Sequence, residues 1–130
     1  MSKEIIYTDK APKPIGPYSQ AILINGTLYA SGQIAIDAAT DSMVNGSIEK
    51  ESNQVLRNLG YVLEAANMSF ENVVKASVFL KSMDDFNSMN KVYNSVFENI
   101  KPARETVEVS RLPKNVNVEI SLIAVSSEND

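Results

Sequence analysis

The chain has 130 residues, of which 44% are apolar, and 16 acidic against 12 basic side chains give a formal net charge of −4. This length predicts a single domain over 1–130, and the absence of cysteine and histidine excludes disulfides, thiol nucleophiles, imidazole bases and the usual zinc ligand sets. We expect no nucleic-acid partner, because such binding depends on clustered Lys and Arg and the sequence has no basic stripe.

The N-terminal segment predicts a cytoplasmic protein. The residues MSKEIIYTDK lack the apolar core of a signal peptide and the arginine-rich character of a transit peptide. No apolar run approaches the roughly 20 residues that a membrane-spanning helix requires. We therefore expect no membrane partner.

Three strands are expected in the first third of the chain. The first covers 3–8, and a loop constrained by its prolines follows at 11–20. Residues 21–24 and 27–33 flank an Asn-Gly pair, which is the strongest short signal for a β-hairpin. A polar loop from 37 to 46 follows.

A helix and a strand are expected next. Apolar residues recur at helical spacing over 48–66, with Ser47 as a plausible cap and Asn67 as a plausible left-handed stop. Residues 73–81 are rich in β-branched and aromatic side chains, which predicts a fourth strand.

A second helix should follow this strand. Ser82 and Asp85 resemble a capping box, and Pro102 ends the segment. Its aromatic stripe is interpreted as core. Two helices with one apolar stripe each should cover the same face of the sheet, which predicts an α+β fold.

The segment 102–124 predicts a hairpin that places an arginine and a glutamate on one face. Two alternating runs are separated by a loop of four residues, 111–114. Matching the apolar faces sets Val109 opposite Val116 and Val107 opposite Val118.

In this register Thr106 faces Glu119, and Arg104 is the diagonal neighbour of Glu119 at roughly 7–8 Å between Cβ atoms. A cation and a carboxylate would then share a polar patch. The alternative is a solvated surface ion pair of little energetic value.

The face of the sheet away from the helices should have a mixed character. Lys75, Ser77 and Phe79 are expected there beside the Arg104–Glu119 patch, with Ser121, Ile123 and Val125. Such a face is explained most simply if other copies of the chain cover it in a symmetric assembly. A solvent-exposed sheet face is the alternative.

Four segments resemble the RidA family, also called YjgF. They are IGPYSQ (15–20), ASGQIAID (30–37), VVKASVFLKSMDDF (73–86) and PARETVEVSRLPKNVNVEISLIAV (102–125). The resemblance implies a chorismate-mutase-like α+β fold with a sheet of about six strands and two helices on one face. It also implies a homotrimer with three clefts between subunits, and the hydrolytic deamination of small 2-imino acids or enamines to 2-keto acids and ammonia.

The same resemblance assigns roles to individual residues. Arg104 would bind the substrate carboxylate, which suits its planar fork of donors. Glu119 would activate the attacking water, and a nearby Arg104 should favour its ionised form. Tyr18 would close the cleft, and Ser31 and Asn90 would line it.

The sequence departs from many relatives at Thr106, where they carry cysteine. Threonine supplies no thiol nucleophile, but it keeps the backbone amide and carbonyl through which this position would bind substrate. The implied reaction depends on positioning a water against an electrophilic carbon. It calls for neither a metal nor an organic cofactor.

Two other functions remain open. A non-enzymatic regulator would use Arg104 only to bind small carboxylates such as keto acids or amino acids. A ribonuclease or translation inhibitor is the third possibility, and the acidic composition weighs against it.

Overall fold

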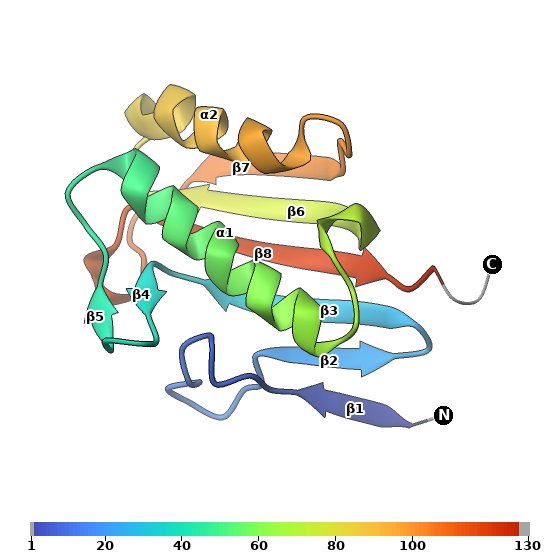
Figure 1. Ribbon diagram of the computed structural model, residues 1–130. Coiled ribbons are helices and arrows are strands. Elements are labelled where there is room, and N and C mark those ends of the chain that lie inside the picture. Colours follow the sequence, from blue (N-terminus) through green and yellow to red (C-terminus); the bar gives the residue numbers. More distant parts are fainter. Residues whose placement is uncertain (1, 128–130) are drawn as a thin grey trace.

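A mixed sheet of six strands organises the computed structural model, which describes residues 2–127. Helices α1 (Ile48–Ala65) and α2 (Phe86–Phe97) both lie on one face of this sheet (Figure 1), as the sequence predicts for an α+β fold. In chain order the strands of the sheet are β1 (Lys3–Ile6), β2 (Ala21–Ile24), β3 (Thr27–Gln33), β6 (Val73–Leu80), β7 (Ala103–Glu108) and β8 (Val118–Val125).

The strand order across the sheet is β1-β2-β3-β8-β6-β7. Only β6 and β7 run parallel, and every other neighbouring pair is antiparallel. Strand β7 is therefore an edge strand and β8 a central one. Among the described residues, no helix combines the length and the apolar character needed to cross a membrane.

The predicted hairpin at Asn25 and Gly26 is confirmed. Both residues have positive φ, 52° and 79°, which is the backbone that a two-residue turn between twisted strands requires. The turn joins β2 to β3 in antiparallel register, with Ile24 opposite Thr27.

The loop after β1 is held by the buried side chain of Gln20. Its Oε1 accepts from the backbone N of Thr8 at 2.7 Å, and its Nε2 donates to the carbonyls of Thr8, Ala11 and Pro12 at 3.0, 3.3 and 2.9 Å. The backbone groups of Thr8 therefore bond to the Gln20 side chain and not to a neighbouring strand. Consequently β1 ends at Ile6 and not at the predicted residue 8.

Helix α1 has the predicted ends. Ser47 accepts a hydrogen bond from the backbone N of Lys50 at 3.0 Å, and Asn67 lies beyond the helix at φ 58°. The buried stripe of α1 packs on β3 and β8, and burying each large aliphatic side chain contributes about 1.5–3 kcal/mol. This stripe consists of Val55, Leu56, Leu59, Val62 and Leu63.

Two local predictions need correction. The polar segment 37–46 includes part of a short two-stranded sheet, formed by β4 (Ile36–Asp37) and β5 (Ser42–Met43). The capping box predicted at Ser82 and Asp85 is wrong. Ser82 caps a separate 3-10 turn, η2 (Met83–Asp85), and Asp85 makes no capping hydrogen bond to α2.

The predicted hairpin between 104–110 and 116–122 is also wrong. Strand β6 lies between β7 and β8, so Val107 pairs with Phe79 and Val118 pairs with Leu80. The connection from 109 to 117 contains a 3-10 turn, η3 (Pro113–Asn115). An alternating pattern defines the two faces of a strand but does not identify its neighbour.

The true topology separates Arg104 from Glu119. Arg104 pairs with Ala76, which is buried beneath the helices, and so Arg104 lies on the helix side of the sheet. Glu119 pairs with Phe79 and lies on the opposite face, which we call the open face. Thr106 pairs with Val78 and joins Arg104 on the helix side, so its expected place opposite Glu119 is also corrected.

The rest of the open face carries the predicted residues. On it Lys75 forms an ion pair with Glu105 at 3.1 Å, and Ser77 donates a hydrogen bond to the same carboxylate. Ile123 lies opposite Lys75 and Ser121 opposite Ser77 on the neighbouring strand. The face therefore has the mixed polar and apolar character expected from the sequence.

Candidate functional site

Arg104 lies on edge strand β7 against the side of helix α2. Its Nη1 donates to Asn90 Oδ1 at 2.7 Å, and its Cζ lies 4.5 Å from the ring centroid of Tyr93 and 5.6 Å from that of Phe86. The three partners are spaced by four and three residues along α2, so they form one stripe of the helix. We call Phe86, Asn90, Tyr93 and Arg104 the arginine half-site.

The guanidinium of Arg104 has no anionic partner in the described part of the chain. The ion pairs found there join Lys10 to Glu64 and Lys75 to Glu105. A guanidinium carries five N–H donors. In Arg104, only Nη1 donates to Asn90. The remaining donors suit a carboxylate, which Arg binds through two parallel hydrogen bonds.

A groove of about 580 Å³ adjoins this arginine. It is lined by Asn90, Tyr93, Asn94, Phe97, Glu98, Lys101, Pro102 and Arg104. The lining combines amides, aromatic rings, the two cations Lys101 and Arg104 and one carboxylate, Glu98. Positive charge therefore exceeds negative charge, which suits a small polar anion.

Backbone groups of β7 add donors and acceptors beside Arg104. The N–H of Val109 donates to the carbonyl of Leu80 at 2.9 Å. Alternation along a parallel pair then turns the N–H and C=O groups of Arg104 and Thr106 away from β6, toward the free edge. The Thr106 hydroxyl is buried without a partner. Thr106 is therefore equipped to contact a ligand through its backbone.

Glu119 occupies a different environment on the open face. Its carboxylate lies directly against the backbone of Gly32, where an added Cβ would stand 2.2 Å from Oε2. Burial raises the pKa of Glu119 above its ordinary 4.5. The prediction that Arg104 favours the ionised form is not met within one chain, because the two groups lie on opposite faces.

Tyr18 and Ser31 lie on the segments next to Gly32. Tyr18 is 50% exposed, and its hydroxyl accepts from the backbone N of Ile15 at 3.3 Å. The Ser31 hydroxyl donates to the carbonyl of Ser19 at 2.7 Å and so ties β3 to the loop that carries Tyr18. A small cavity lined in part by Tyr18 and Gly32 joins these segments. We call Tyr18, Ser31, Gly32 and Glu119 the glutamate half-site.

The six residues selected from the sequence thus fall into two groups. Asn90, Thr106 and Arg104 lie on the helix side of β7. Glu119 lies on the open face against Gly32, the chain neighbour of Ser31, and Tyr18 lines a small cavity together with Gly32. A single copy does not bring Arg104 and Glu119 together.

Sequence reasoning missed four residues of this arrangement. Phe86 and Tyr93 were interpreted as core, because the spacing along α2 does not show that their rings also face Arg104. Gly32 belongs to the ASGQ segment, which was the available signal, but its contact with Glu119 requires the bulged pairing of β3 with β8. No sequence pattern indicated that Gln20 holds the loop after β1 through its hydrogen bonds.

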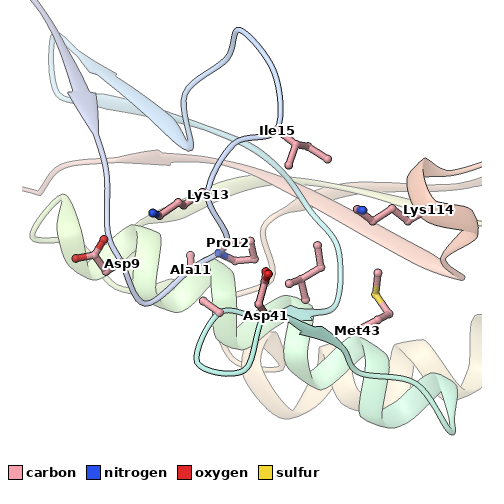
Figure 2. Close-up of a pocket in the computed structure, with 10 residues that line it drawn as sticks. Asp9, Ala11, Pro12, Lys13, Ile15, Asp41, Met43 and Lys114 are labelled. Atoms are coloured by element: carbon pink, nitrogen blue, oxygen red, sulfur yellow. The ribbon is translucent and has the colours of Figure 1, made fainter.

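A larger cavity of about 710 Å³ lies away from Arg104 and adjoins the small cavity of the glutamate half-site, with which it shares Pro12, Lys13, Ile15 and Ile36. Figure 2 shows it between the N-terminal loop, the segment with Asp41 and Met43, and the turn that carries Lys114. Its charged side chains are exposed and of both signs. Because size alone does not define a binding site, we place the candidate site at Arg104, where a half-buried cation lacks a counter-ion.

Metal chemistry finds no support in the acidic residues. In residues 2–127, no group of three or more Asp or Glu side chains is arranged to hold a metal ion.

Comparison with known proteins identifies a family over nearly the whole chain. The endoribonuclease L-PSP family matches residues 8–126. A RutC family protein of Pyrococcus horikoshii is 53% identical, with 94% of this chain and 97% of that protein covered. The human protein named 2-iminobutanoate/2-iminopropanoate deaminase is 43% identical, with 95% and 90% covered.

The fold is shared with solved structures of this group. The crystal structure of E. coli TdcF with bound serine superposes with a TM-score of 0.91 at 35% identity, covering 95% of this chain and 99% of that one. RidA from the Antarctic bacterium Psychrobacter gives a TM-score of 0.90 at 38% identity, with 94% and 98% covered. The expected RidA-type fold is confirmed.

Proposed function

The chain belongs to the endoribonuclease L-PSP family, which includes the RidA proteins, and on this premise we propose that it hydrolyses small 2-imino acids, or their enamine tautomers, to 2-keto acids and ammonia. The observation that carries the proposal is Arg104, a half-buried guanidinium without an anionic partner in the described chain. Relatives at 43–47% identity bear the name of this activity.

Arg104 would bind the substrate carboxylate. Asn90 and Tyr93 already hold one side of the guanidinium, so its other N–H groups are available at the groove. Each charge-assisted hydrogen bond there is worth about 1.5–3 kcal/mol. The serine in the related E. coli structure is itself a small molecule with a carboxylate, which supports a ligand of this class.

The two half-sites would meet between copies of the chain. Arg104 and Glu119 lie on opposite faces of one sheet, so one catalytic centre requires both groups to come from different subunits. The homotrimer implied by the family resemblance supplies such contacts, with the arginine half-site of one copy beside the glutamate half-site of the next. Each of its three clefts would then be complete.

The reaction follows from positioning and proton transfer. Glu119, as a carboxylate, takes a proton from water while the water oxygen bonds to the imine carbon, and the C=N bond becomes a single bond. When the imine is protonated, this addition gives a neutral carbinolamine and protonated Glu119. Glu119 then returns the proton to the nitrogen, the C–N bond breaks, and ammonia leaves as the hydroxyl becomes C=O and gives its proton to Glu119. In the single chain, burial raises the carboxyl pKa of Glu119, and in a shared cleft Arg104 of the neighbouring copy would favour the ionised form that acts as the base.

A coupled assay tests the proposal. A pyridoxal-phosphate-dependent dehydratase generates 2-iminobutanoate or 2-aminoacrylate in situ, and the release of keto acid is followed with and without the purified protein. We expect acceleration by the wild type, its loss in Arg104→Ala, and its retention in Arg57→Ala, which removes an exposed arginine from α1. Equal rates with and without folded wild-type protein would contradict the proposal.

A carboxylate-binding regulator is the second candidate, favoured by the amino acid bound in the E. coli relative. It would use the same Arg104 contacts without turnover. Calorimetric binding of 2-oxobutanoate that Arg104→Ala abolishes, together with an inactive wild type, would select this function.

Ribonuclease activity is the third candidate, because the family description names an endoribonuclease. It would require binding to phosphates, yet the chain has a net charge of −4 and no histidine. RNA binding that weakens steeply with salt would support it.

A further inference from the structure

We propose that Tyr93 is a positioning residue for Arg104, and that its aromatic ring fixes the guanidinium in the orientation that receives the substrate carboxylate. This inference rests on the carboxylate-binding role of Arg104 in the proposed function. It adds a residue that is 5% exposed and is argued to act through Arg104.

The geometry gives the guanidinium two aromatic neighbours and one polar anchor. Tyr93 is the nearer ring, at 4.5 Å from Cζ against 5.6 Å for Phe86, and Asn90 fixes Nη1 at 2.7 Å. A cation within about 6 Å of a ring centroid is attracted by the ring face. Two separated contacts therefore restrict both the position and the rotation of the group.

Tyr93 is itself rigidly packed. It is 5% exposed, and its ring lies 4.6 Å from that of Phe97, which in turn meets the ring of Phe70 edge to face at 5.4 Å. Arg104 lacks such support on β7, because its strand is the sheet edge. A long arginine side chain loses much rotamer freedom on ordering. A ring that already holds the arginine side chain reduces the conformational entropy that the side chain loses when substrate binds.

The ring, and not the hydroxyl, performs this role. The Tyr93 hydroxyl is buried and makes no hydrogen bond of good geometry within the described chain. Burial raises the pKa of Tyr93, while the charge of Arg104 and the approach of the hydroxyl to its guanidinium oppose the shift. A hydroxyl enclosed in this way cannot reach a ligand in the groove. Phenylalanine should therefore replace Tyr93 without loss of function.

The test compares Tyr93→Phe with Tyr93→Leu in the coupled assay. Loss of the cation–π contact should raise KM about tenfold in Tyr93→Leu, with kcat nearly unchanged because binding to substrate and transition state weakens equally. Tyr93→Phe should keep the wild-type KM. The dissociation constant of 2-oxobutanoate should change in parallel.

A second readout does not depend on activity. In ¹⁵N-labelled protein, the ring current of Tyr93 should shift the Arg104 Nε–Hε resonance, and this shift should persist in Tyr93→Phe and disappear in Tyr93→Leu. Phe70→Leu is the matched control, because it removes a ring that contacts Phe97 and not Arg104. It should lower thermal stability and leave both KM and the Arg104 resonance unchanged.

The outcomes separate this inference from the proposed function. A wild type without turnover would contradict the deaminase, while the resonance and 2-oxobutanoate binding would still decide the role of Tyr93. An unchanged resonance or an unchanged KM in Tyr93→Leu would overturn the inference. An equal loss in Tyr93→Phe and Tyr93→Leu would also overturn it, because the hydroxyl would then be responsible.

Discussion

Arg104 and Glu119 carry opposite charges that one copy of the chain keeps apart. Had they formed the expected neighbouring pair, each would have neutralised the other, and a substrate carboxylate would have had to displace Glu119. Instead, aromatic rings and an amide hold the cation, and the acid is desolvated against Gly32. Each group is left free to act on a ligand.

Gly32→Ala should reduce activity without unfolding the protein. The new methyl group would lie 2.2, 2.8 and 3.0 Å from Oε2, Cδ and Cγ of Glu119, so the glutamate side chain must shift as a whole. A displacement of about 1 Å at a catalytic group can lower the rate by roughly 100-fold. The coupled assay and a thermal melt measure the two effects.

Gly60→Ala is the control for this substitution, because Gly60 lies in α1 beside Phe70 and away from both half-sites. It should retain wild-type turnover. Wild-type turnover in Gly32→Ala would show that the position of the Glu119 carboxylate does not matter.

Because the pKa of Glu119 is raised, rising pH should lower its contribution to stability and increase catalytic activity. The folded protein binds this proton more tightly than the unfolded chain, so the contribution to stability is full below the ordinary value of 4.5 and is lost as pH rises through the raised pKa. Glu119→Gln cannot ionise. It should therefore melt at a higher temperature than the wild type at neutral pH, and this difference should vanish in acid.

Activity should increase with pH, whereas the contribution of Glu119 to stability decreases with pH. A general base must be ionised, so kcat/KM of the wild type should fall as pH decreases through the raised pKa, and Glu119→Gln should be inactive throughout. Thermal melts and rates over the same pH series provide both curves. A Glu119→Gln variant that melts below the wild type at neutral pH would contradict burial as the cause of the shift.

At the scale of elements, a buried carboxylate connects α1 to the start of β8. Glu51 is 2% exposed and accepts hydrogen bonds from Asn117 N, Asn117 Nδ2 and Val118 N at 2.7, 2.9 and 3.1 Å. Glu119 follows directly, so this contact also fixes where the glutamate half-site begins.

Glu51→Gln should lower the free energy of unfolding by about 3 kcal/mol, because the amide replaces an acceptor by a donor that faces N–H groups. Urea unfolding measures this loss. Glu49→Gln, an exposed change in the same helical turn, should cost far less. An equal loss in both variants would show that Glu51 acts only through its charge near the helix end.

The limits of sequence reasoning are clearest in β7. Helix α1, the Asn25–Gly26 turn and the left-handed Asn67 were predictable, because each depends on local periodicity or local backbone preference. The partner of β7 depends on long-range topology. Its valines indicated a core face, yet Val107 is 40% exposed, while the helix side of this edge strand carries Arg104 and Thr106. The proposed carboxylate-binding role of Arg104 would account for that reversed pattern.

At the scale of the whole molecule, the open face suggests contact with further copies. It presents exposed apolar side chains such as Ile5, Tyr29 and Val107 beside the Lys75–Glu105 ion pair. Exposed apolar side chains distributed across a sheet face are explained if other copies of the chain cover that face. The proposed homotrimer would cover it and bring Arg104 of one subunit to Glu119 of another.

Mixed assemblies test this arrangement directly. Arg104→Ala and Glu119→Gln should each be inactive alone. If they are unfolded together in equal amounts and refolded, a cleft works only where one copy supplies an intact Arg104 and its neighbour an intact Glu119. In a closed ring, each cleft takes Arg104 from one copy and Glu119 from the next. Random assembly of the two variants therefore gives both intact residues in about one quarter of the clefts.

The recovered activity of the mixture distinguishes shared from self-contained sites. If one copy supplied both groups of a site, mixing could not restore activity, because every copy in the mixture lacks either Arg104 or Glu119. Each variant refolded alone controls for damage during refolding, and light scattering of the same samples gives the number of subunits. A refolded trimer without recovered activity would rule out a site shared between subunits, and the separation of Arg104 from Glu119 in one copy would then contradict their joint role in catalysis.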